Sequence, residues 1–149
     1  MRQIAYALRS TGRARRGGTD GNVLVISTTA PGRTVHAWEE DHGPEGSSHL
    51  HLTGAVTCES ELVVTGDVSF QQAGSVRFGA GQDRLRFSTD GNGHFASGPA
   101  IDGQRGTAIW RVDGGEGWFA GASGTICSIF VISDDGEVTD HHLGVVHIE

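Results

Sequence analysis

The segment that most restricts the fold of this chain is a glycine-rich stretch over residues 112–124 (VDGGEGWFAGASG). It separates two runs typical of β-strands, residues 107–111 (TAIWR) and residues 125–132 (TICSIFVI). Glycine adopts positive φ at little cost, so a link of this composition predicts a turn between two strands. No helical pattern follows the glycines, which makes the segment a poor phosphate-binding loop.

The rest of the chain repeats the same pattern of short apolar runs divided by turn residues. Glycine accounts for 24 of the 149 residues, more than double the usual share of about 7%. About nine strand-like runs recur at intervals of roughly 8–12 residues, without an amphipathic helical pattern between them. They cover residues 22–28, 33–39, 49–58, 61–70, 75–78, 84–88, 106–112, 125–133 and 138–148. We therefore predict an all-β chain that forms a single antiparallel barrel or sandwich of eight to nine strands.

The chain has the length of one domain, and no linker divides it, so we predict a single domain over residues 1–149. Its first residues combine a basic cluster with glycines; these are Arg9, Gly12, Arg13, Arg15, Arg16, Gly17 and Gly18. This composition predicts a partly flexible N-terminal segment over residues 1–20.

The charge balance excludes several classes of function. The net charge is −7, whereas a nucleic-acid-binding surface needs a basic stripe, so we expect no nucleic-acid partner. All 11 basic side chains are arginines, so no lysine ε-amine is present to form a Schiff base or to act as a general base. No apolar run approaches the roughly 18 residues of a membrane span, so we expect no membrane partner. Cys58 and Cys127 lack metal-binding spacing, which predicts free thiols in a cytoplasmic protein, with Cys127 buried in its apolar run.

Two of the strand-like runs are apolar on both faces, residues 23–26 and residues 126–132. A strand of this kind is covered on both sides. In a barrel, one face lines the interior and the other needs an outer cover, either the N-terminal segment or a neighbouring subunit. We therefore expect a homo-oligomer, a dimer or a trimer.

The glycine-rich segment also carries a resemblance to a known family. Its pattern, V-x-G-G-x-G-x-F-x-G-A-x-G, together with residues 75–81 (SVRFGAG) and 134–140 (DDGEVTD), resembles the allene oxide cyclase-like and dirigent-type barrels. The resemblance covers about the last 75 residues and implies an eight-stranded, calycin-type barrel with an internal apolar pocket. Such proteins include plant allene oxide cyclases and small bacterial cyclases of polyketide biosynthesis, and they use no cofactor.

The expected function follows from this resemblance. It implies a cofactor-independent cyclase or isomerase that folds an apolar, polyene- or polyketide-like substrate in the barrel interior for ring closure, in natural-product biosynthesis. Holding a flexible molecule in its reactive geometry supplies several kcal/mol of the barrier reduction, roughly 7–11 at best. Two alternatives stay open: a non-catalytic barrel that carries or shields a small molecule, and a His-dependent metal enzyme.

The candidate catalytic residues are three histidines on strand-like runs. His36 shares a strand face with Trp38, so His36 is a candidate hydrogen-bond donor or general base and Trp38 a pocket wall. His49 and His51 also share a face, and their spacing is that of a metal-binding pair. The Glu that such a pair needs four or five residues later is replaced by Ala55 and Val56, so no metal site is predicted.

Four further residues are candidates for substrate binding. Trp110 is expected in the core or as a pocket wall, and Phe119 at the barrel end. Arg86 and Arg111 are solubilising charges if they point outward, and clamps for a carboxylate or an enolate oxygen if they point inward. The run Asp140-His141-His142 is expected to be a solvated strand start, with a functional role as the alternative.

Overall fold

The structure is a computed structural model of the 149-residue chain. It describes residues 2–19, 21–32, 36–41, 47–49, 54–96 and 103–149, with residues 36–41 and 47–49 described by their backbone alone. The strands are β1 (Arg2–Gly17), β2 (Val23–Ala30), β3 (His36–Asp41), β4 (Ser47–His49), β5 (Val56–Val64), β6 (Ser69–Phe78), β7 (Arg84–Thr89), β8 (Gly93–Phe95), β9 (Gln104–Glu116), β10 (Ser123–Ile132) and β11 (Glu137–Ile148).

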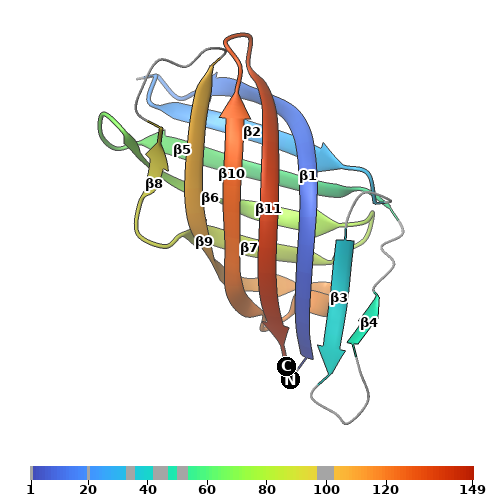
Figure 1. The fold of residues 1–149 in the computed structure, drawn as a ribbon. Helices are drawn as coiled ribbons and strands as arrows, with labels where there is room; N and C mark the ends of the chain where they lie inside the picture. The colour runs from blue at the N-terminus through green and yellow to red at the C-terminus, as the bar shows by residue number, and fades with distance from the viewer. Residues whose placement is uncertain (1, 20, 33–35, 42–46, 50–53, 97–102) are drawn as a thin grey trace.

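Eight of these strands close into a barrel, which confirms the predicted fold class (Figure 1). The order around the ring is β1, β2, β5, β6, β7, β9, β10 and β11, and β11 returns to pair with β1. Every pairing is antiparallel. The short strand β8 pairs with β6 and β9, the same two strands that flank β7. The two remaining strands lie outside this ring, because β3 pairs with the first half of β1 and β4 pairs with β3.

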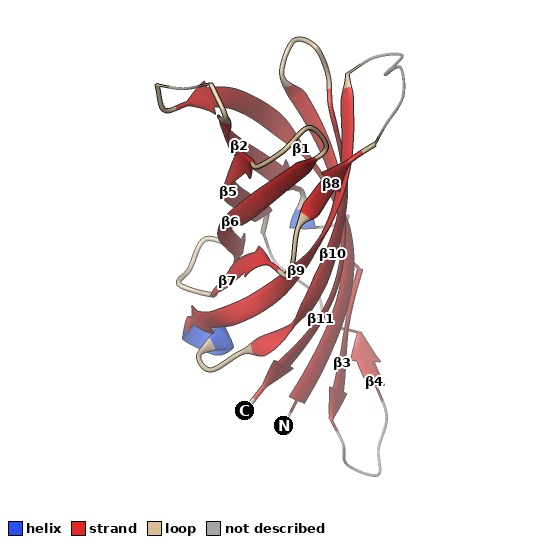
Figure 2. Ribbon diagram, turned by 90° about the vertical axis from the view of Figure 1, so that its left-hand side faces the viewer, coloured by secondary structure: helices blue, strands red, loops and turns tan. Residues whose placement is uncertain are grey.

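The barrel is flattened into two layers that cross each other. β1, β9, β10 and β11 run side by side in one layer, and β2, β5, β6 and β7 cross behind them (Figures 1 and 2). Each strand presents alternate residues to the interior, as a pleated strand must. In β9, for example, Ala108, Trp110 and Val112 are buried while Ile109 and Arg111 between them are exposed.

Aromatic rings fill the interior, and glycines directly opposite them on the neighbouring strands make room for three of them. A Cβ on Gly144 would lie 2.2 Å from the ring of Tyr6, and a Cβ on Gly106 would lie 2.3 Å from the ring of Phe130. Gly93 stands in the same relation to Phe70. Part of the high glycine content is therefore explained by packing in the barrel rather than by turns alone.

The glycine-rich segment is a link between two strands, as its composition predicts. β9 runs on to Glu116, a single 3₁₀ turn, η2, covers Gly117–Phe119, and β10 begins at Ser123. Gly114, Gly117 and Gly121 all have positive φ, which side-chain-bearing residues rarely adopt. The turn carries Phe119 into the core, where its ring lies 5.0 Å from that of Phe78.

Three local expectations differ from the structure. Residues 2–17 form β1, the strand that closes the barrel, rather than a flexible segment, because they hydrogen-bond to both β11 and β2. The predicted strand over residues 61–70 is interrupted by a turn between β5 and β6. Cys127 is exposed rather than buried, since it points to the outer face of β10. Within the described residues, no helix is long and apolar enough to cross a membrane.

Candidate functional site

Two of the predicted substrate-binding residues lie in the barrel interior. Trp110 is fully buried, and its indole stacks on Phe87 with ring centroids 3.9 Å apart. Phe119 is also buried and lies at the end of the barrel that η2 covers. Both positions are those expected of core residues, and Trp110 also adjoins the polar groups described below.

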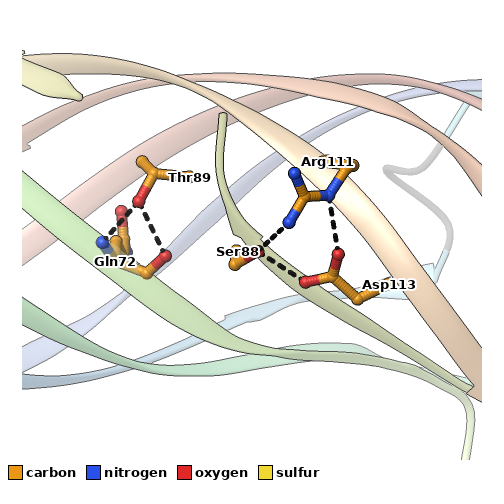
Figure 3. Close-up of polar contacts among 5 residues, drawn as sticks. All are labelled: Gln72, Ser88, Thr89, Arg111 and Asp113. Carbon is orange, nitrogen blue, oxygen red and sulfur yellow. Dashed lines mark hydrogen bonds and ion pairs between the residues drawn. The ribbon is translucent and has the colours of Figure 1, made fainter. Parts of the chain in front are cut away.

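The two predicted arginines point outward. The side chain of Arg111 is 60% exposed and bonds to Asp113 and Ser88, as Figure 3 shows, and Arg86 pairs with Glu116 at 3.3 Å. Burial acts to raise the pKa of Asp113, but hydrogen bonds from Ser88 and Arg111 and the charge of Arg111 outweigh it and lower that pKa. These residues form a surface network, so the inward-facing clamp does not hold for either arginine.

The predicted catalytic histidines lie largely outside what the structure describes. The backbone places His36 opposite Ala7, and Trp38 opposite Ala5 on one side and His49 on the other. Their side chains are outside the described part of the chain, as is His51 altogether. β3 and β4, which carry these residues, lie outside the closed ring of eight strands.

A buried acid–base pair lies instead on the inner face of β11. Asp140 and His142 are 4% and 1% exposed, and Nε2 of His142 lies 2.8 Å from Oδ2 of Asp140. Ser128 on β10 donates to the other carboxylate oxygen of Asp140 at 2.7 Å. An ionised carboxylate only accepts hydrogen bonds, so Nε2 of His142 is the donor to Asp140, and in the neutral tautomer Nδ1 carries the lone pair.

This order of contacts excludes a serine-hydrolase triad. In such a triad the serine hydroxyl bonds to the histidine, which in turn bonds to the carboxylate. Here Ser128 bonds to Asp140 and not to the ring of His142. Asp140 therefore fixes the orientation of His142, and Nδ1 of His142 is left as a base with no hydrogen-bond partner among the described residues.

Two donors beside this pair also lack partners. The hydroxyl of Tyr6 and Nε1 of Trp110 are buried and make no hydrogen bond within the described residues. The rings of Trp110 and His142 are nearly perpendicular, with centroids 4.8 Å apart, and Tyr6 covers Gly144, two residues beyond His142 on the same inner face. Burial, with the charges of Cys58 and Asp140, raises the pKa of Tyr6, so its hydroxyl keeps its proton. We call Tyr6, Trp110, Ser128, Asp140 and His142 the interior cluster.

Other buried polar groups in the barrel are mostly satisfied by one another. Ser10 donates to Thr28 at 3.0 Å. The hydroxyl of Thr89 bonds to the backbone of Gln72, as Figure 3 shows, and the Gln72 amide donates to a further serine. Burial, with the charges of Asp140 and Glu59, raises the pKa of Cys58, which makes its thiol a poor nucleophile. Most buried polar groups in folded proteins are paired. Within the described residues, the unpartnered buried side-chain atoms are the three of the interior cluster together with Oε1 of Gln72, Nε of Arg84 and Nδ1 of His147.

The end of the barrel nearest this cluster opens into a cavity of about 540 Å³. Its lining includes the inward-facing ends of three strands, Ala14, Leu24 and Ile132, and the β10–β11 turn over residues 133–136. Along the inner face of β11, buried Val138 separates this mouth from Asp140. This cavity is the mouth of the barrel, and no residue of the interior cluster lines it.

The outer face of the same layer is apolar. Ile109, Cys127, Leu143 and Ala7 form one cross-strand row over β9, β10, β11 and β1, and Leu143 is 63% exposed. We call the exposed part of this surface the outer patch; its residues are Ile109, Cys127, Ile129, Val131, Leu143 and Val145. A shallow cavity of about 300 Å³, lined almost wholly by apolar atoms, lies on it.

The described residues do not form a metal site. No three His, Cys, Asp or Glu side chains within them lie close enough together to hold an ion.

The sequence pattern did not identify the two inward-facing polar residues of β11. Sequence reasoning treated Asp140-His141-His142 as a solvated strand start, whereas Asp140 and His142 point inward and only His141 is exposed. The available signal was parity: Val138, Val146 and Ile148 occupy the same strand face as Asp140 and His142.

Comparison of the chain with models of known protein families, with curated proteins and with solved structures finds no match in any of the three.

Proposed function

We propose that this protein is a cofactor-independent isomerase or cyclase that acts on an apolar small molecule inside the barrel. The proposed substrate is of the polyene or polyketide kind, and the proposed setting is natural-product biosynthesis, as the resemblance to allene oxide cyclase-like barrels implies. The observation that carries the proposal is the buried Asp140–His142 pair. Nδ1 of His142 is buried and has no hydrogen-bond partner among the described residues.

The pair has the features of a general base. A histidine held by a carboxylate on one ring nitrogen presents the other in a fixed orientation, and imidazole is the side-chain group that most often transfers protons in catalysis. Its surroundings are apolar and aromatic, which excludes water from a reactive intermediate. In this arrangement His142 is the proposed catalytic residue, and Asp140 is a positioning residue that acts through it.

A substrate reaches this pair only after a local opening. The interior cluster is closed to solvent, and Val138 lies between it and the mouth of about 540 Å³. Binding therefore selects a conformation in which side chains on this path have moved, which lowers the apparent affinity by the fraction of open molecules.

The test is conversion of a bound small molecule. The protein is incubated with a metabolite extract of its source organism, and native mass spectrometry with chromatography of the released compounds follows. We expect a retained apolar molecule and a product of equal mass, and we expect His142→Gln to abolish the product. His141→Ala is the matched control, because His141 is the exposed neighbour on the outer face of β11.

Each outcome of this experiment is decisive. A molecule that is retained but not converted overturns the enzyme and leaves a carrier barrel. Equal conversion by His142→Gln and the wild type removes His142 from the reaction. No retained molecule overturns the proposed interior site.

We further propose that the protein forms homo-oligomers through the outer patch. The three strands that carry the patch, β9, β10 and β11, and the length of β10 from Thr125 to Val131 give this surface about 300 Å² in projection. Exposed apolar patches of this size mark interaction surfaces. A stable interface needs about 800 Å² from each partner, so a second copy of the same face would bury the patch as its apolar centre within a polar rim.

Oligomeric state tests this second proposal. We expect Leu143→Glu to convert the oligomer to a monomer in light scattering, because a carboxylate would be buried in the apolar centre. Val68→Glu is the control, since Val68 is 48% exposed in the β5–β6 turn and outside the patch. A monomeric wild type, or equal effects of the two substitutions, overturns the role of the patch.

We also propose a cytoplasmic location, on the ground that Cys58 and Cys127 are both free thiols.

A further inference from the structure

The unpartnered polar atoms of the interior cluster restrict what its ligand can be. Tyr6 and Trp110 each offer one hydrogen to a partner, and the indole of Trp110 can only donate. Nδ1 of His142 offers a lone pair. A hydrocarbon would leave all three atoms unsatisfied, whereas a ligand with one accepting oxygen and one removable proton would satisfy them.

We infer that the substrate is an apolar unsaturated ketone, and that Tyr6 and Trp110 bind its carbonyl oxygen while His142 moves a proton on the adjacent carbon. This inference rests on the proposed function and names the chemical class of its substrate. The placement supports it, because the Trp110 and His142 rings lie with centroids 4.8 Å apart and the ring of Tyr6 covers Gly144, two residues along the same inner face.

The reaction balances without any added reagent. Nδ1 of His142 takes the proton from the carbon beside the carbonyl, and the C–H electron pair becomes the carbon–carbon double bond of a dienolate. The carbonyl π electrons move to the oxygen, which accepts hydrogen bonds from Tyr6 and Trp110. His142 then returns the proton to the far carbon of the dienolate, the oxygen becomes a carbonyl again, and the product is an isomer of equal mass.

Asp140 acts in this sequence as a positioning residue. It holds the hydrogen on Nε2 of His142 at 2.8 Å and stabilises the imidazolium that exists while His142 carries the extra proton. Ser128, which donates to the second oxygen of Asp140, holds the carboxylate in that orientation. No nucleophile, metal or redox group takes part in these steps.

Two small aromatic probes test the inference. A phenolic ring system resembles an enolate, so we compare 2-naphthol with naphthalene, which has the same shape without the oxygen. We expect the wild type to bind 2-naphthol at least about tenfold more tightly, the equivalent of one charge-assisted hydrogen bond. Tyr6→Phe should reduce this preference at least about fivefold, and bound 2-naphthol should show the absorption of its anion in the wild type.

A stability measurement separates this role from a structural one. The hydroxyl of Tyr6 makes no hydrogen bond within the described residues, so Tyr6→Phe should not lower the thermal midpoint of the free protein. His141→Ala should change neither the preference nor the midpoint.

The outcomes separate this inference from the proposed function. Equal binding of the two probes, binding of neither, or a full preference for 2-naphthol in Tyr6→Phe overturns the ketone. The extract experiment makes no assumption about a carbonyl, so a product there with equal probe affinities discards the ketone and keeps the enzyme. Absence of product there discards the proposed function whatever the probes show.

Discussion

The inner and outer faces of the β9–β10–β11 layer differ from what stability alone would favour. The inner face buries Asp140 and His142, and the outer face exposes Ile129 and Leu143, at 59% and 63%. Burying polar and charged groups costs free energy that well-packed apolar residues do not require, and large exposed apolar patches are uncommon on monomers. Both features are explained if the inner face binds a small molecule and the outer patch binds a second copy of the chain, as we propose.

The largest expected effect comes from breaking the inner pair. Asp140→Ala removes the carboxylate that both Ser128 and His142 contact, and leaves two buried polar groups without a partner. Each buried polar group left without a partner costs about 1–3 kcal/mol, so with two such groups we expect a loss of about 2–6 kcal/mol in the free energy of unfolding. Chemical denaturation measures it, with His141→Ala as a control that should stay within about 0.5 kcal/mol. An equally small effect of Asp140→Ala would show that the Asp140–His142 pair does not contribute to the free energy of unfolding.

The next effect concerns the ring that covers the inner face. A Cβ on Gly144 would lie 2.2 Å from the Tyr6 ring, so Gly144→Ala forces the ring to move. Overpacking of this kind costs about 1–3 kcal/mol, and the displaced phenol should also lose its preference for 2-naphthol. Gly81→Ala is the matched control, because no atom lies within 4 Å of its Cβ position. Equal stability of the two variants would mean that the interior has spare room beside Tyr6.

The barrel itself is predictable from sequence because its signals are local. Turn residues such as Asp134, Asp135 and Gly136 mark the hairpins, and alternation along residues 75–78 and 84–88 marks strands with one buried face. The glycine-rich segment predicts a link between two strands, and the structure has one there. The length of β1 was missed because its arginines suggested a solvated segment, although they alternate with inward-facing residues such as Ser10 and Ala14.

The site is far less predictable, because it depends on which face of each strand turns inward. A shift of one residue exchanges the two faces, and only the closed ring settles the choice. Arg86 and Arg111 were left open between the two directions for this reason, and both turn outward. Asp140 and His142 look like ordinary polar residues near a turn until pairing with β10 and β1 places them inside. The unpartnered atoms of Tyr6 and Trp110 have no sequence signal at all.

The smallest expected effect sharpens the comparison between the buried pair and the surface network. Arg111 and Ser88 hold the pKa of Asp113 below its usual value of 3.8. A carboxyl with a lowered pKa in the folded state stabilises the protein above its unfolded pKa, and this contribution disappears as the pH falls through the folded pKa. Asp113→Asn should therefore be slightly less stable than the wild type at pH 7, and the difference should shrink on acidification and vanish once the pH is below the lowered pKa of the folded state. Denaturation midpoints at a series of pH values measure this; a difference that grows on acidification would contradict the assigned sign, and a loss as large as that of Asp140→Ala would mean that the outer network contributes as much as the buried pair.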